Sequence, residues 1–196
     1  MKKFLSLFLV SAILVICALS LASCSGDVTE GVPEGMKIAS SEQADYYFYV
    51  PEGASWICDV ASGATTAYYS NTDTSNVSVM DYILANTDYK VEDWWNSFEN
   101  DFKNVYGDFE VVSSENVILD GVSALKTVFT GKMNVGIDSA GEPIVRDYKF
   151  MQISAIRSAT LSAPKAYVFT YTSLNDDTFD SHLEDVETMI ENFKFK

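Results

Sequence analysis

The order of apolar patterns predicts an α/β fold, an antiparallel β-sheet flanked by helices in an α/β/α sandwich. Short apolar runs between turn signals predict strands, and consecutive strands joined by tight turns predict antiparallel neighbours. Two segments with apolar stripes of helical period predict helices that need sheet faces to cover. Along the chain come several strands, a helix, four strands in hairpins and a terminal helix.

The first predicted strand, Tyr46–Val50, ends at the turn Pro51-Glu52-Gly53. Its residues are apolar on both faces, which fits a sheet covered above and below. Three further strands are expected at Ser55–Val60, Thr65–Ser70 and Val77–Leu84.

The clearest predicted helix is Val91–Tyr106. One stripe of about 120° holds its apolar side chains, at positions 91, 94, 95, 98, 102, 105 and 106. Glu92 and Asp93 lie in the first turn, where the helix dipole favours acids, and Gly107 follows as a stop signal. Trp94 and Trp95 could form a sugar-stacking platform, but their place on the single apolar stripe favours core packing.

Four predicted strands follow this helix. Phe109–Leu119 and Val122–Val135 flank Asp120-Gly121, a strong two-residue hairpin signal. A second hairpin turns near residues 138–141 and returns as Ile144–Ile156, and Ala166–Ser173 is the last long strand.

The chain closes with a predicted helix from about Thr178 to Phe193. Its apolar stripe consists of Phe179, Leu183, Val186, Ile190 and Phe193. Asp177 is a plausible N-cap for this helix.

Three stretches resemble the PsbP/Mog1 fold, a family that includes many bacterial lipoproteins. They are the aromatic strand, Pro-x-Gly turn and nearby tryptophan of Tyr46–Trp56, the helix opening Val91-Glu92-Asp93-Trp94-Trp95, and the closing segment Phe179–Phe195. The resemblance covers residues 45–196 and implies the sandwich fold. Lys90 departs from the family, which often has a Ser or Thr helix cap there. Family members assist photosystem II or bind a small GTPase, but no residue motif of this chain carries either role.

The N-terminal segment predicts export. Lys2 and Lys3 precede an apolar run from Phe4 to Leu21, and small residues then lead to a cysteine. Leu21-Ala22-Ser23-Cys24 resembles the lipobox of bacterial lipoproteins, which implies that residues 1–23 are a removed signal peptide and that Cys24 is lipidated. Two or more acyl chains, palmitate among them, hold a protein stably at a membrane.

Two other interpretations of this segment stay open, a retained transmembrane helix and a plain secretory signal. On the lipoprotein interpretation, residues 24–44 are a lipidated flexible tether, because they lack periodicity and are rich in Gly, Ser, Glu and Pro. Residues 45–196 are the folded domain. The expected location is the cell membrane, with the lipid-anchored domain on its extracytoplasmic face.

The composition limits the partners. The whole chain has a formal charge of −15, and removal of Lys2 and Lys3 leaves 11 basic against 28 acidic side chains, a charge of −17. Such acidity argues against nucleic acid and against docking on anionic lipid through a basic patch. Cys58 is the one cysteine left after signal removal and lipidation, so the domain cannot contain a disulfide of its own.

No catalytic motif stands out. His182 is the sole histidine, at the border of the terminal helix's apolar stripe, which excludes His-rich metal sites. We find no nucleophile elbow, glycine-rich dinucleotide motif or P-loop, and we predict no cofactor. Two acidic loops provide weak calcium candidates, Asp73 in one and Asp176, Asp177 and Asp180 in the other, although helix capping explains the last two adequately.

Three functional hypotheses follow. We favour a non-catalytic accessory or interaction domain, anchored to the membrane through Cys24, that binds an unidentified protein partner and no nucleic acid. The alternative is a lipoprotein that binds a small ligand, peptide or glycan through surplus aromatics such as Tyr68, Tyr69 and Tyr82. A less favoured hypothesis is a hydrolase that uses an acidic pair.

Overall fold

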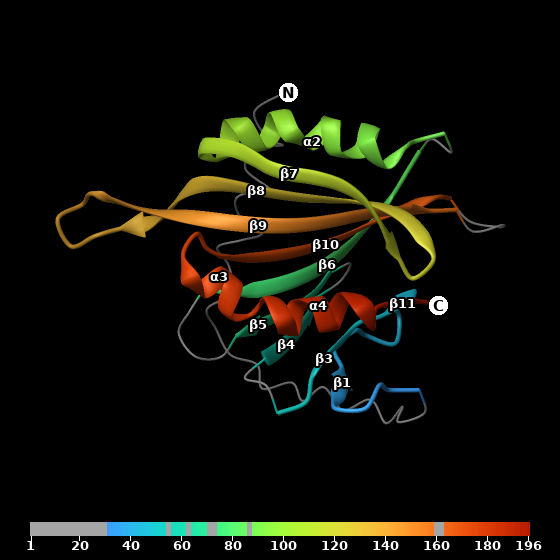
Figure 1. Ribbon diagram of the computed structural model, residues 1–196. Helices are drawn as coiled ribbons and strands as arrows, with labels where there is room; N and C mark the ends of the chain where they lie inside the picture. Colours follow the sequence, from blue (N-terminus) through green and yellow to red (C-terminus); the bar gives the residue numbers. More distant parts are fainter. Residues whose placement is uncertain (1–30, 54–55, 62–63, 70–73, 86–87, 159–162) are drawn as a thin grey trace.

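A seven-stranded antiparallel sheet with helices on both faces forms the body of the protein (Figure 1). The computed structural model describes residues 31–53, 56–61, 64–69, 74–85, 88–158 and 163–196. The strand order in the sheet is β4-β5-β6-β10-β9-β8-β7. These strands are β4 (Trp56–Ala61), β5 (Ala64–Tyr69), β6 (Asn76–Ile83), β7 (Gly107–Leu119), β8 (Val122–Ile137), β9 (Pro143–Arg157) and β10 (Lys165–Leu174). The predicted antiparallel α/β/α sandwich is confirmed.

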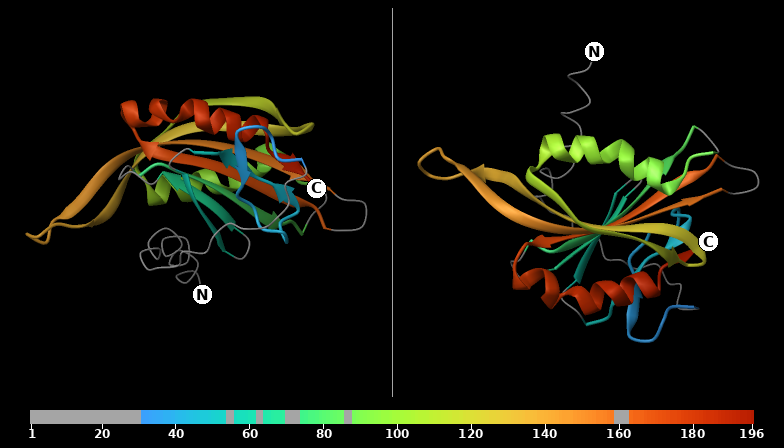
Figure 2. Two further views of the ribbon diagram at one scale, coloured as in Figure 1. Left: turned by 90° about the horizontal axis from the view of Figure 1, so that it is seen from below. Right: turned by 45° about the horizontal axis from the view of Figure 1, so that its top comes forward.

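The helices form the outer layers. Helix α2 (Val91–Val105) lies on one face of the sheet, and α3 (Asp177–Ser181) and α4 (Leu183–Glu191) lie on the other (Figures 1 and 2). α2 begins at the predicted residue after Lys90, whose backbone N–H donates to the Asp93 carboxylate at 3.3 Å. The acid in the first turn therefore supplies one half of a capping box, by accepting the N-cap N–H, while Lys90 has no side-chain oxygen to cap the first-turn N–H groups.

Each face of the sheet has its own core. The face under α4 holds the largest cluster, which joins Val77 and Val79 of β6 and Phe169 of β10 to Val186 and Met189 of α4. Under α2 lie two smaller clusters, one around Trp95 and Phe129 and the other around Trp94 and Val168. Both predicted apolar stripes are therefore the packed faces of their helices, although Val105 at the end of the α2 stripe is exposed.

The segment before β4 departs from the prediction. Tyr46–Val50 is not a strand of the main sheet: β2 (Tyr46–Tyr47) pairs with β11 (Lys194–Phe195), and β3 (Tyr49–Pro51) pairs with β1 (Met36–Ile38). The burial on both sides that suggested a central strand has another cause. Phe48 and Val50 belong to the core under α4, so the segment covers a face of the sheet.

The predicted tether is too long at its C-terminal end. β1 lies within residues 24–44, and Met36 and Ala39 are buried. Ser40 Oγ accepts a hydrogen bond from the Phe48 N–H at 3.1 Å. Residues 36–44 therefore pack with the domain, through the pairing of β1 with β3 and the burial of Met36 and Ala39.

The predicted single closing helix is two helices. The chain breaks at His182, where φ is −108° and ψ is 2°. The N-cap of α3 is Asp176 and not Asp177, since the Asp176 carboxylate accepts the Thr178 N–H at 2.8 Å. The apolar stripe continues across the break, so packing on the sheet holds the two pieces in line.

Residues 1–23, Cys24 and Asp73 lie outside the described residues, and so do the N-terminal residues of the predicted tether. In the part of the chain that the structure describes, every helix is too short or too polar to span a bilayer.

Candidate functional site

The predicted calcium candidates have structural roles where they are described. Asp176 caps α3, and this bond with Thr178 holds the pKa of Asp176 below its usual value. Asp180 Oδ1 lies 3.8 Å from the Lys149 ammonium, and Asp177 is in the first turn of α3. Across the described segments, no three His, Cys, Asp or Glu side chains gather as metal ligands.

His182 lies in an aromatic pocket. Its ring is 4.1 Å from the Tyr69 ring and 5.9 Å from the Trp56 ring, between centroids. The Trp56 Nε1–H donates to Asp185 Oδ2 at 2.8 Å, which links this pocket to α4. The histidine therefore packs where the closing helix breaks.

The aromatic residues proposed for ligand binding do not form one surface. Trp94 and Trp95 are both buried, so core packing is confirmed and the sugar-stacking interpretation is wrong. Tyr82 packs on Trp94, with ring centroids 5.1 Å apart. Tyr69 faces the α4 side with Trp56, whereas its neighbour Tyr68 points to the opposite side of β5 and is exposed.

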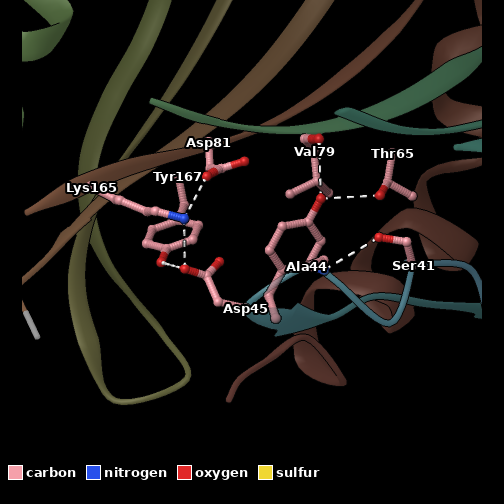
Figure 3. A network of polar contacts seen from close by, with 9 residues as sticks. Ser41, Ala44, Asp45, Thr65, Val79, Asp81, Lys165 and Tyr167 are labelled. Carbon is pink, nitrogen blue, oxygen red and sulfur yellow. Dashed lines mark hydrogen bonds and ion pairs between the residues drawn. The ribbon is translucent and has the colours of Figure 1, made fainter. Parts of the chain in front are cut away.

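A polar cluster joins the segment before β2 to the sheet (Figure 3). Lys165 Nζ lies 2.8 Å from Asp45 Oδ2 and 2.8 Å from Asp81 Oδ2. The Tyr167 hydroxyl donates to the same Asp45 oxygen at 2.9 Å. Beside it, the Tyr46 hydroxyl lies 3.0 Å from Thr65 Oγ1 and donates to the Val79 carbonyl at 3.4 Å.

The electrostatics of this cluster favour a structural role. Hydrogen bonds to Asp45 and Asp81 raise the pKa of Lys165, and burial with the Asp45 bond raises the pKa of Tyr167. Burial raises the pKa of Asp45, but its bonds from Lys165 and Tyr167 outweigh burial and leave that pKa below its usual value. At neutral pH the lysine and the tyrosine thus keep their protons and donate to the carboxylates, as in a structural network.

The clearest candidate for interaction is the end of the β8–β9 hairpin, which projects beyond both helical layers (Figure 1). Pairing with β7 ends at Lys132, and pairing with β10 ends at Tyr148. We call residues 133–147 the distal ribbon. At its base, Met133 and Val135 are half-buried against the core under α2, and the Asp147 carbonyl accepts the Asn175 N–H at 3.0 Å. The β8 residues of this ribbon, 133–137, span roughly 16 Å beyond the end of the pairing with β7.

Local hydrogen bonds order this ribbon. Asp138 Oδ1 accepts the N–H groups of Ala140 and Glu142 at 2.8 and 2.9 Å, which closes the tip. Asn134 Oδ1 accepts the Gly136 N–H at 3.0 Å, where the register shifts by a bulge. The tip is thus a defined turn.

The distal ribbon exposes large aliphatic side chains that the fold does not bury. Ile137 is 70% exposed, Val145 55% and Ile144 38%. Because adjacent strand residues point to opposite faces, Ile144 and Val145 place apolar groups on both sides. Asp138, Glu142 and Asp147 are exposed on the same ribbon, against one exposed cation, Arg146. This combination is typical of a protein-binding surface with a polar rim.

Comparisons with known proteins place the fold. No protein-family model and no curated protein matches the sequence. LpqN, a protein involved in cell envelope biogenesis of Mycobacterium tuberculosis, superposes with a TM-score of 0.57 and 13% identity, over 82% of this chain and 90% of LpqN. Cyanobacterial PsbP (CyanoP) from Synechocystis superposes with a TM-score of 0.52 and 16% identity, over 90% of this chain and 99% of CyanoP. The Ran-binding protein Mog1p of Saccharomyces cerevisiae superposes with a TM-score of 0.50 and 12% identity, over 82% of this chain and 95% of Mog1p.

The fold is of the PsbP/Mog1 type. The expectation drawn from the aromatic strand, the helix opening and the closing segment is confirmed at the level of the fold. Identities this low carry the fold alone, so activity and partners do not pass from these neighbours to the PsbP/Mog1-like chain described here.

Sequence reasoning missed the distal ribbon as a surface. The turn near residues 138–141 was predicted. The extension of β8 and β9 past the ends of β7 and β10 was not. The lengths of the predicted strands held the signal. Val122–Val135 and Ile144–Ile156 are each longer than the neighbouring strands Phe109–Leu119 and Ala166–Ser173, so their ends must extend past those neighbours.

Proposed function

We propose that this protein is a non-catalytic interaction module, held on the outer face of a bacterial membrane by lipid on Cys24, that docks on a protein partner through the distal ribbon. The main observation behind this proposal is that an ordered ribbon exposes Ile137, Ile144 and Val145. An isolated two-stranded ribbon gains little stability in water, and burial of each aliphatic side chain on a partner is worth about 1–3 kcal/mol.

The charge of the ribbon favours a protein partner over the lipid surface. Asp138, Glu142 and Asp147 surround the apolar residues, and anionic lipid repels carboxylates. A partner pocket lined by apolar groups and rimmed by Lys or Arg fits this surface.

Three further observations support a binding role over catalysis. Lys165 and Tyr167 are held in their protonated forms, and His182 packs among aromatic rings. Mog1p, which has the same fold, is a Ran-binding protein, and LpqN is involved in cell envelope biogenesis. Each of these observations fits an accessory module.

The anchor is tested by mass and fractionation. We expect the mature protein to begin at Cys24 with a mass increased by diacylglycerol and an acyl chain, and to sediment with membranes. Cys24→Ala should abolish both properties, while Cys58→Ala, the matched control, should leave them intact. An unmodified Cys24, or a mature chain that keeps residues 1–23, would contradict the anchor.

The docking surface is tested by photocrosslinking in cells. A photoreactive residue at Ser139, on the exposed tip, should give a discrete protein adduct, whereas the same residue at exposed Glu187 of α4 should not. Equal adduct patterns at both positions, or none from the tip, would overturn the proposal.

A further inference from the structure

The two edges of the main sheet differ in how they are protected. β4 forms one edge, is six residues long, and its Trp56 carbonyl accepts a hydrogen bond from Lys37 Nζ at 3.2 Å. β7 forms the other edge, is 13 residues long, and pairs with β8 alone among the described strands. No hydrogen bond from another described segment covers its outer backbone, and natural proteins usually blunt an edge of this length.

Only part of β7 is regular enough to accept another strand. The register with β8 shifts between Gly107 and Glu110 and again between Val111 and Ser113. From Ser113, opposite Val128, to Leu119, opposite Val122, the pairing runs residue by residue. Such a run spans roughly 23 Å and offers outward N–H and C=O groups to an extended segment of similar length.

The side chains along this run favour a cationic occupant. Glu115 is the one charged residue within it, and its side chain is 60% exposed even though Lys126 Nζ lies 3.3 Å away. Ile118, 68% exposed, offers an apolar contact on the opposite face of the strand. A second copy of the mature protein would bring Glu115 toward its counterpart and join two molecules of charge −17, so charge disfavours self-pairing.

We propose that the outer edge of β7, Ser113–Leu119, binds an extended cationic segment of a partner protein as an eighth strand of the sheet. Backbone hydrogen bonds supply the affinity, Glu115 attracts Lys or Arg of the incoming strand, and Ile118 contacts an apolar residue. This edge is separate from the distal ribbon, so each proposal stands or fails by its own test.

The test uses the protein purified from cells in non-ionic detergent and a seven-residue probe of alternating Lys and Val. Fluorescence anisotropy measures binding, and hydrogen exchange maps protected amides. We expect new protection confined to 113–119. The same peptide with alternate amides N-methylated keeps its charge but loses strand pairing, and should bind at least about tenfold more weakly.

Charge-reversal variants distinguish a local attraction by Glu115 from the general attraction of a cationic peptide to an acidic protein. Glu115→Lys should weaken the probe about tenfold or more, while Asp59→Lys on the opposite edge, with the same change in net charge, should weaken it about twofold at most. Equal effects of the two variants, equal binding of the methylated peptide, or protection outside β7 would overturn the proposal. Dimerisation that protects 113–119 without peptide would also overturn it, in favour of self-pairing.

Discussion

The same two strands, β8 and β9, behave differently along their length. Within the sheet, Phe129 and Phe150 are almost fully buried and stack with centroids 4.7 Å apart under α2. A few residues further on, beyond the ends of β7 and β10, Ile137 and Val145 are mostly exposed. Similar apolar residues therefore stabilise the fold in one place and are available to a partner in the other.

The difference lies in the neighbours and not in the strands. Where β7, β10 and α2 flank the hairpin, each apolar side chain gains burial. Past Lys132 and Tyr148 the pairing with β7 and β10 stops. Met133 and Val135 still pack on the core under α2, and beyond Val135 the two strands of the ribbon pair only with each other. Substitutions along this hairpin should consequently fall from large effects on stability to negligible ones.

The largest effect is expected in the body of the sheet. Phe129→Ala removes a ring that contacts Trp95, Phe102 and Phe150, and should lower the free energy of unfolding by about 3–5 kcal/mol. Chemical denaturation measures this loss. A loss below about 1 kcal/mol would mean that the α2 core is not packed as described.

A smaller effect is expected at Gly131, where the Tyr106 side chain lies over the strand. A Cβ at this position would meet Tyr106 Cβ at 2.6 Å, so Gly131→Ala should displace the tyrosine and cost about 1–3 kcal/mol. Gly107→Ala is the matched control, because its nearest contact is an ordinary 3.7 Å to Lys132. Equal costs of the two variants would contradict the close approach of Tyr106.

The polar cluster should contribute less than the aromatic core. Lys165→Gln leaves Asp45 and Asp81 without their shared cation and should lower the free energy of unfolding by about 1–2 kcal/mol at pH 7. Lys126→Gln, which breaks the more exposed pair with Glu115, should cost at most about 0.5 kcal/mol.

The pH dependence of this cluster follows from the directions of its pKa shifts. The lowered pKa of Asp45 gives stability that is complete above the ordinary Asp value near 3.9 and is lost in acid as the pH falls through the folded value. The raised pKa values of Lys165 and Tyr167 give stability that is complete below about pH 10 and is lost as the pH rises further. The penalty of Lys165→Gln should therefore shrink at both extremes, and a constant penalty would contradict the cluster.

The sequence predicted what depends on local pattern. The period of Trp94, Trp95 and Phe98 placed α2, and Asp120-Gly121 placed the first long hairpin, because both signals act within a few residues. Asp120 and Gly121 have φ of 44° and 77°, as such a turn requires.

Long-range pairing explains what the sequence did not predict. Tyr46–Val50 has the composition of a central strand, but its partners are β1 and β11, from opposite ends of the described chain. At the break, the His182 ring packs on rings from β4 and β5, which lie far from it in the sequence. The distal ribbon depends on where β7 and β10 end, which no pattern within residues 133–147 encodes.

The central claim is that the exposed end of the distal ribbon, beyond Val135, serves binding and not folding, and one triple variant tests it most directly. Ile137→Ser, Ile144→Ser and Val145→Ser together should change the free energy of unfolding by no more than about 0.5 kcal/mol per site. In the same variant, the protein adduct formed from a photoreactive residue at Ser139 should disappear. A marked loss of stability, or an adduct that survives unchanged, would contradict this account of the protein.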